Sequence, residues 1–140
     1  MCILVAVAND AASTAVVGTA VGLAEMADQE LYIVNLVDES VSPDTAEQLR
    51  SDIRDRMVES GVVSTVAVEP ISRSSMRSGS AVGAELLNIA ADVDATHIVM
   101  GHEPKGLGGR LREGDAAFAV IESAEVPVTV VPEGATGGAD

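Results

Sequence analysis

Residues 97–131 read HIVMGHEPKGLGGRLREGDAAFAVIESAEVPVTVV, and this stretch decides the fold. It begins with a short apolar strand pattern, continues through a glycine-rich loop and a short helical pattern, and ends in a β-branched run. Two strands joined through a helix form a crossover connection, which makes them parallel neighbours in one sheet. This stretch therefore predicts an α/β protein.

The rest of the chain repeats the same alternation of strand and helix patterns. The predicted strands are 3–8, 31–37, 62–68, 96–100 and 126–131, and the predicted helices are 11–27, 43–60, 81–92 and 115–123. Ser42-Pro43 is typical of a helix start, and Gly61 of a helix end. We predict a single doubly wound, flavodoxin-like domain over residues 1–132, with a parallel sheet covered by helices on both faces. Residues 133–140 are predicted to form a flexible tail.

The composition limits the kinds of partner that the protein can bind. Aromatic residues make up only 1% of the chain, which argues against a platform that stacks nucleic-acid bases. A formal net charge of −14 opposes binding to nucleic acid and to anionic membranes. Together with the single lysine, Lys105, it favours adaptation to a cytoplasm at molar salt, where the Debye length is about 3 Å. The alternative is an ordinary soluble acidic protein.

No targeting or membrane segment is recognisable. The first basic residue is Arg50, so the N-terminus lacks the charged region of a signal peptide. The longest apolar run, residues 11–24, is too short to span a bilayer. We expect a cytoplasmic protein without membrane insertion. The single cysteine, Cys2, has no internal partner and is expected to pack in the core.

Three local sequence patterns give further predictions about the helices. Asn9-Asp10 precedes the first predicted helix and is suited to cap it. Gly18 and Gly22 lie four residues apart in that helix and predict close packing of the helix on the sheet. The second helix carries a mixed-charge face that is expected to be solvated; its charged residues are Glu47, Arg50, Asp52, Arg54, Asp55, Arg56 and Glu59.

With these elements and motifs, the chain resembles the universal stress protein family. The most specific parts are ILVAV at residues 3–7, GAELLNIAADVDATHIVMG at residues 83–101, and VPVTVV at residues 126–131. The resemblance implies the adenine-nucleotide α-hydrolase-like variant of the fold, with a five-stranded sheet in the order 3-2-1-4-5. It also implies a homodimer, and ATP binding through a loop of the form G-x2-G-x9-G-(S/T) after the fourth strand.

The loop GHEPKGLGGRLREGD, residues 101–115, keeps only part of that pattern. Gly101 and Gly114 match with the right separation, but Pro104 occupies the second glycine position and Asp115 the Ser/Thr position. Proline has no N–H to offer a phosphate, and its ring adds bulk where glycine allows close approach. Asp115 precedes a predicted helix, where its carboxylate can accept the N–H groups that an anion would need.

The first strand also departs from the pattern that the resemblance implies. ATP-binding members carry V-P-V-D there, with the Asp near the ribose, whereas this chain has Ala6 and Ala8 at the Pro and Asp positions. Asp10 follows two residues later and is a weaker candidate for the same role. Val37 matches a position whose backbone borders adenine. We therefore predict that the usual ATP-binding mode is lost and that no cofactor is required.

A nucleotide-binding switch, with slow ATP hydrolysis at most, is the alternative. In that reading Gly106, Gly108 and Gly109 supply backbone donors, and Arg110 or Arg112 compensates for Asp115. The basic residues are concentrated in two loops at the carboxyl edge of the predicted sheet, where doubly wound folds bind ligands; they are Arg73, Arg77, Lys105, Arg110 and Arg112. A smaller anion is a third possible ligand. The ordinary explanation of these clustered basic residues is that they form ion pairs within the loops.

The sequence contains no recognisable catalytic constellation and no metal-ligand pattern. His97 is expected to be a core residue, and His102 beside Glu103 is expected to be a loop residue without a nucleophile or further ligands. The last strand is an apolar edge without Lys or Arg to guard it, and we expect it to form a dimer through Val126, Val128, Val130 and Val131. The preferred hypothesis is a non-enzymatic regulatory or protective dimer that acts on a protein partner not readable from the sequence.

Overall fold

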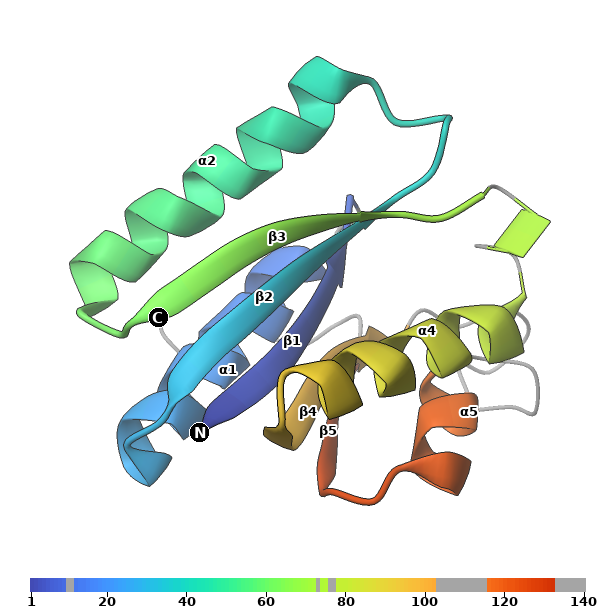
Figure 1. Cartoon of the computed structure of the whole chain (residues 1–140). Helices are drawn as coiled ribbons and strands as arrows, with labels where there is room; N and C mark the ends of the chain where they lie inside the picture. The colour runs from blue at the N-terminus through green and yellow to red at the C-terminus, as the bar shows by residue number, and fades with distance from the viewer. Residues whose placement is uncertain (10–11, 73, 76–77, 103–115, 133–140) are drawn as a thin grey trace.

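The computed structural model describes residues 1–9, 12–72, 74–75, 78–102 and 116–132. Strands and helices alternate along this part of the chain, as the sequence patterns predict (Figure 1). The elements are β1 (Cys2–Ala8), α1 (Ser13–Ala27), β2 (Glu30–Val37), α2 (Pro43–Ser60), β3 (Ser64–Pro70), α4 (Gly79–Asp92), β4 (Ala95–His102), α5 (Ala116–Ser123) and β5 (Val128–Pro132).

The five strands form one parallel sheet in the order β3-β2-β1-β4-β5. This confirms the predicted fold class and strand order. β1 lies in the centre and pairs with both β2 and β4, so that Ala6 lies opposite Val34 on one side and opposite Met100 on the other. The chain first builds the sheet outward through β2 and β3, and then crosses back to add β4 and β5.

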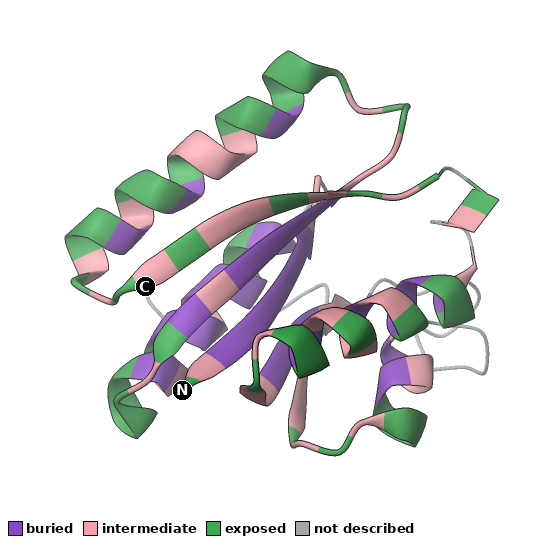
Figure 2. Cartoon of the chain, in the orientation of Figure 1, coloured by how far each residue is buried: buried purple, intermediate pink, exposed green. Residues whose placement is uncertain are grey.

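Two hydrophobic layers cover the two faces of the sheet. On one face, side chains of α1 and α2, including Val16 and Met57, pack on β1 and β2. On the other face, side chains of α4 and α5, including Leu86 and Val120, pack on β1 and β4. Figure 2 shows that the buried residues are concentrated on the central strands and on the helix sides that face them. The sheet is therefore doubly wound, with a core made almost entirely of aliphatic side chains.

The fourth and fifth strands differ at their ends from the sequence prediction. β4 continues to His102 instead of ending at Met100, because Gly101 and His102 still pair with Val131 and Pro132 of β5. β5 begins at Val128 rather than two residues earlier. As a consequence, Gly101 belongs to a strand and not to the loop that follows it.

The third strand is shifted by two residues toward the C-terminus, and spans Ser64–Pro70 instead of 62–68. Its register places Pro70 opposite Val37, and the Ile71 amide donates to the Val37 carbonyl at 2.8 Å. Proline is tolerated at this point because β3 is an edge strand and Pro70 is its last residue.

Helix α2 begins and ends as its sequence predicts. The Ser42 hydroxyl accepts a hydrogen bond from the Thr45 amide at 3.1 Å, and Gly61 closes the helix at φ +73°. Helix α4 has the same kind of N-cap, because the Ser78 hydroxyl accepts a hydrogen bond from the Ala81 amide at 3.3 Å. A hydroxyl at this position satisfies an amide that the first helical turn leaves without an intrahelical partner.

Two expectations for α1 concern its start and its glycines. The residue at the N-cap position is Ala12, whose side chain makes no cap hydrogen bond. The Asn9 side chain bonds Asn35 and the Thr45 carbonyl instead, and the other predicted cap, Asp10, lies outside the described residues. Gly18 is buried, but Gly22 is exposed, and a Cβ built there meets nothing within 4 Å. Gly22 therefore plays no part in packing α1 on the sheet.

Glycine has a steric role between α4 and α5 instead. A Cβ at Gly83 would lie 2.7 Å from the Cβ of Ala119 and 3.4 Å from the Ala116 carbonyl oxygen. Real Cβ atoms do not approach this closely, so Gly83 allows these two helices to touch. We expect Gly83→Ala to destabilise the protein by about 1–3 kcal/mol through overpacking.

The matched control is Gly22→Ala, which adds the same methyl group to an open position on a helix. It should stabilise the protein by about 0.5–1 kcal/mol, because alanine loses less backbone entropy in a helix. Chemical denaturation of the two variants measures both effects. Equal changes in the unfolding free energy for both variants would contradict this account of the α4–α5 contact.

Candidate functional site

The structure contains a cleft of about 330 Å³ at the carboxyl edge of the sheet. It lies where β1 is flanked by β2 on one side and β4 on the other, which is the point where the strand order reverses. Open α/β sheets bind their ligands at this position. The described lining residues are Ala6, Val7, Ala8, Asn9, Ala12, Ser13, Val16, Leu36, Asp38, Ser40, Val41, Val82, Leu86, Met100, Gly101, His102, Ala116 and Ala117.

Gly101 lies in the wall of this cleft and allows close packing there. A Cβ at this position would lie 3.1 Å from a methyl carbon of Val16 and 3.3 Å from the Cβ of Ala12. The absence of a side chain thus lets the start of α1 approach the end of β4. Gly101 is the first glycine of the loop pattern implied by the family resemblance, and its geometry gives it a packing role in addition.

The end of β2 contributes a carboxylate to the cleft. Asp38 Oδ1 accepts a hydrogen bond from the Ser40 amide at 2.7 Å and another from the Ser40 hydroxyl. The Asp38 carbonyl accepts from the Val41 amide at 3.2 Å, which completes a turn. Val37 is the last residue of β2 and lines a neighbouring groove beside α2, not the cleft. Sequence reasoning missed Asp38, although a carboxylate directly after a strand that ends at this edge is a usable signal.

His102 is a strand residue, in contrast to the loop position that the sequence suggests. It is the last residue of β4, is 9% exposed, and lines the cleft. His102 belongs to the strand because β4 extends two residues beyond the end of its apolar pattern. An imidazole and a carboxylate thus reach the same cleft from different strands.

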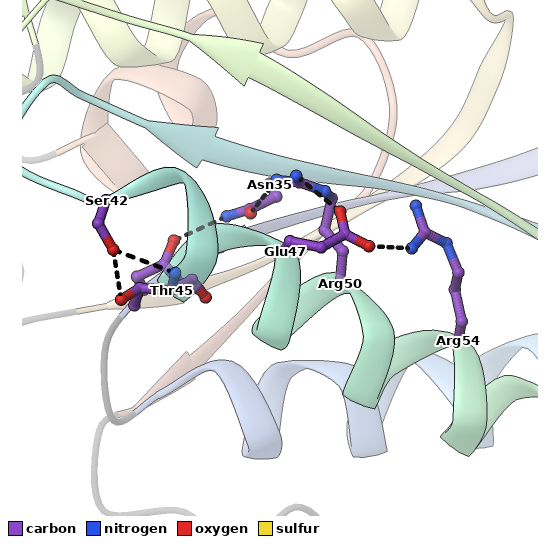
Figure 3. Close-up of polar contacts among 7 residues, drawn as sticks. Asn35, Ser42, Thr45, Glu47, Arg50 and Arg54 are labelled. Carbon is purple, nitrogen blue, oxygen red and sulfur yellow. Dashed lines mark hydrogen bonds and ion pairs between the residues drawn. The ribbon is translucent and has the colours of Figure 1, made fainter.

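A buried amide connects the cleft to helix α2 (Figure 3). Asn35 of β2 is fully buried, and its Nδ2 donates to Asn9 Oδ1 at 3.1 Å and to the Leu36 carbonyl at 3.4 Å. Its Oδ1 accepts from Arg50 Nη1 at 3.2 Å. Asn9 in turn donates to the Thr45 carbonyl at 3.5 Å. Because Asn9 lines the cleft, this network joins the cleft to the first turns of α2.

The sequence predicts that Arg50 lies on a solvated face of α2, and this prediction is wrong. Its side chain is only 14% exposed and also forms an ion pair with Glu47 at 3.0 Å. Glu47 bonds Arg54 at 3.1 Å as well, but both of these side chains are about half exposed. Hydrogen bonds from Arg50, and then from Arg54, lower the pKa of Glu47 below its ordinary value. The signal that could have revealed this network is Asn35, a polar residue within an otherwise apolar strand.

Comparison with known proteins identifies the family. A sequence model of the universal stress protein family matches residues 1–132. This chain belongs to the universal stress protein family. Comparison with curated protein sequences gives no match.

Solved structures of universal stress proteins have the same fold. One from Archaeoglobus fulgidus has a TM-score of 0.70 at 21% identity, and the match covers 94% of this chain and 98% of that one. A second A. fulgidus structure, in complex with dAMP, has a TM-score of 0.63 at 21% identity, with 94% and 97% covered. A universal stress protein in complex with cAMP has a TM-score of 0.69 at 19% identity, with 95% and 97% covered.

Most of the ligand-binding candidates of this universal stress protein lie outside the described residues. They are Asp10, Gly106, Gly108, Gly109, Arg110, Arg112, Gly114 and Asp115, and the basic residues Arg73, Arg77 and Lys105 lie outside as well. Their roles stay predictions. The residues around them are described on two sides, because β4 ends at His102 and α5 begins at Ala116, and both of these residues line the cleft.

The remaining candidate side chains have structural partners. His97 Nε2 lies 2.7 Å from Thr129 Oγ1 of β5, and burial lowers the pKa of His97. Cys2 Sγ donates to the Val93 carbonyl at 3.4 Å, and burial raises the pKa of its thiol. Among the described residues, no group of three or more His, Cys, Asp or Glu side chains could hold a metal ion. None of the described helices has the length and apolarity needed to cross a membrane.

The network around Asn35 yields a test. Arg50→Ala removes a partner of a fully buried amide oxygen, which we expect to cost about 1–3 kcal/mol of folding free energy. The matched control is Arg54→Ala, which breaks an exposed ion pair with the same Glu47 and should change the stability far less, because solvent screens that pair. Denaturant titrations at constant salt give both values. If the two variants lose the same stability, the Arg50–Asn35 hydrogen bond does not support the fold.

Proposed function

We propose that this universal stress protein is a non-enzymatic regulatory dimer that does not bind ATP in the mode implied by the family's loop pattern. The observation that carries the proposal is the lining of the cleft at the end of β1. Ala8 occupies the position of the ribose-binding Asp in the V-P-V-D pattern of the first strand and presents only a methyl group to the cleft, which Ala6 and Asn9 also line. Without that carboxylate, one polar contact of the usual mode is missing.

The sequence of the loop after β4 supports the same proposal. Pro104 lacks the amide that glycine would provide, and Asp115 directly precedes the first residue of α5. A carboxylate at a helix start stabilises the helix dipole and repels a phosphate from the same place. A regulatory protein of this kind would act through a protein partner rather than through nucleotide turnover.

A nucleotide-binding switch is the second candidate, and a specific observation favours it. Two of the similar universal stress proteins are described as complexes with dAMP and cAMP. The cleft of this chain lies at the sheet edge where such folds bind ligands. Gly106, Gly108 and Gly109, together with Arg110 or Arg112, would then supply the missing phosphate contacts.

We also propose that the protein works in a salt-rich cytoplasm. Its net charge of −14 is not balanced by lysines, since Lys105 is the only one. Within the fold, burial raises the pKa of Glu69 of β3, and the negative charge of Glu85 on α4 raises it further. High salt screens the repulsion among acidic side chains at the surface.

The dimer is proposed to form through β5, an edge strand of the sheet. Val126, Val128 and Val130 are half-buried, whereas Val131 is buried in the core and can reach a partner only through its backbone. No lysine or arginine lies in β5 to prevent pairing with another chain. The other edge, β3, carries Glu69 and ends in a proline.

We expect Val128→Lys to convert the dimer into a monomer, because a lysine on the edge strand must be desolvated when two chains pair. The matched control is Val68→Lys on β3, the opposite edge strand, where Val68 is 47% exposed. Light scattering at several salt concentrations reports the mass of each variant. The proposal is wrong if the wild-type protein is monomeric at every salt concentration, or if the Val128→Lys variant is still a dimer.

The nucleotide proposal is tested by titration calorimetry with Mg-ATP at constant salt. The wild type should bind weakly or not at all, and Asp115→Ser should bind better, since it removes the carboxylate and keeps a capping group. Adding Pro104→Gly should strengthen binding again. Each charge-assisted contact that is recovered is worth about 1.5–3 kcal/mol.

The control for these variants is Asp115→Asn, which removes the charge but keeps an equally good helix cap. Improved binding in both Asp115 variants assigns the effect to the charge, and improvement in Asp115→Ser alone assigns it to the side-chain shape. Micromolar ATP binding by the wild type would overturn the proposal and favour the nucleotide switch.

A further inference from the structure

The outer edge of β3 presents backbone groups that no described strand pairs with. β3 is the last strand on its side of the sheet and pairs with β2 alone among the described strands (Figure 1). The Val63 carbonyl and the Ile71 amide both form hydrogen bonds to the β2 side. Because backbone groups alternate in direction along a strand, the amides and carbonyls of Ser64, Val66 and Val68 point away from β2. These groups can pair with one more strand.

An apolar groove of about 550 Å³ lies beside this edge, between the last turns of α2 and the start of β3. Its apolar lining comes from Met57, Val58, Val62, Val63 and Val66. Val58 is 83% exposed and Val63 is 64% exposed, and Val68 further along the edge is exposed as well. Exposed large apolar side chains of the described chain are thus concentrated along one edge strand, which is typical of an interaction surface.

The opposite face of β3 carries negative charge without a basic neighbour among the described residues. Val66 packs on the layer of α1 and α2, so Glu69, an odd number of residues away, lies on the other face of the strand. Burial raises the pKa of Glu69, and the negative charge of Glu85 on α4 raises it further. The described arginines all belong to α2, and the described residues include no lysine. A basic side chain placed on this face is therefore attracted by two carboxylates.

These two faces fit an extended basic segment better than a second copy of this chain. An added strand directs alternate side chains to opposite faces, one set toward the groove beside α2 and the other toward Glu69. A second copy would bring another chain with a net charge of −14, including its own Glu69. A segment that carries lysine or arginine complements both this face and the overall charge.

We propose that β3 binds an extended segment of a partner protein as a sixth strand of the sheet, and that this segment alternates apolar with basic side chains. The inference rests on the proposed function, because it gives the chemistry of the partner through which a regulatory protein would act. Backbone hydrogen bonds hold the segment, and the two faces of β3 select its side chains. Since β3 and β5 are opposite edges of the sheet, the proposed dimer leaves β3 accessible.

The probe is an end-blocked heptapeptide of alternating valine and lysine, and the readout is amide hydrogen exchange measured by NMR. In the free protein, the outward amides of Ser64, Val66 and Val68 should exchange rapidly, whereas those of Thr65 and Ala67 should be protected by β2. Saturating peptide should slow exchange of the three outward amides by at least about tenfold. The same peptide with a fully N-methylated backbone should not bind, because it has no amide donors.

A peptide with glutamate in place of lysine tests the charge. It should bind about tenfold more weakly than the lysine peptide, and the difference should shrink as the salt concentration rises. Glu69→Gln should weaken binding of the lysine peptide and not that of the glutamate peptide. The matched control is Glu25→Gln, which removes the same charge from an exposed position on α1 and should leave both affinities unchanged.

Two further variants test the groove and the edge. Val58→Ser removes apolar surface from the groove and should lower the affinity about fivefold. Its control is Met26→Ser on α1, where the side chain is similarly exposed, at 80%, and lies outside the groove lining. Val68→Lys places a cation on the edge itself and should abolish binding of the lysine peptide while the mass of the dimer stays the same.

The outcomes separate this inference from the proposed function. If the lysine peptide does not bind, or binds without protecting the outward amides of β3, the inference is wrong and the proposed function stands. Protection of these amides in the free protein that increases with protein concentration would show that a second copy covers the edge, which also overturns the inference. Micromolar ATP binding by the wild type would instead overturn the proposed function and leave the exchange result unaffected.

Discussion

The central strand is the constraint on which the rest of the structure depends. β1 pairs on both sides, and its residues Ile3, Leu4 and Val5 are buried on both faces of the sheet. A strand in this position needs a helix layer on each face, which the crossovers through α1 and α4 provide. Because all five strands are parallel, their carboxyl ends meet at one edge, and that edge collects the cleft residues from β1, β2 and β4.

The core is aliphatic, and small residues set the distances within it. Gly83 brings α4 against α5, and Gly101 brings the start of α1 against the end of β4. Without aromatic rings to fill space, such a core gains its stability from close contact among many small side chains. The same small residues, at Ala6 and Ala8, leave the cleft open where larger side chains would close it.

Asn35 introduces polarity into this core and forms a buried hydrogen bond to α2. A fully buried amide must have its hydrogen bonds satisfied, and its partners come from Asn9 at the cleft and Arg50 on α2. The hydrogen bond from Arg50 to Asn35 adds a directional contact between α2 and β2 to the aliphatic packing of Ile53 and Met57. The position of α2 and the position of Asn9 in the cleft are therefore linked through one side chain.

Residue patterns predicted the elements and the parallel, doubly wound sheet because those depend on local periodicity and on connection length, whereas the strand order 3-2-1-4-5 was implied by the family resemblance. Ser42 and Gly61 fixed both ends of α2 correctly. The errors occur where contacts with a neighbouring element determine the local structure. The pairing of Gly101 with Val131 extends β4, so that His102 is a strand residue. Arg50 has the sequence context of a surface residue, and only the position of Asn35 beneath it makes it a core partner. Most of the candidate loop residues stay predictions.

Electrostatic repulsion acts on any anion that approaches this protein, and its range depends on salt. The chain carries a formal net charge of −14, which repels anions over long distances when screening is weak. At about 0.01 M salt the Debye length is roughly 30 Å, so the charge of the whole chain acts on an anion well before it reaches the cleft. At molar salt the Debye length is about 3 Å, and the same charge is largely screened. Binding of an anion at the carboxyl edge of the sheet therefore depends on the whole chain at low salt and on the contacts within the cleft at high salt.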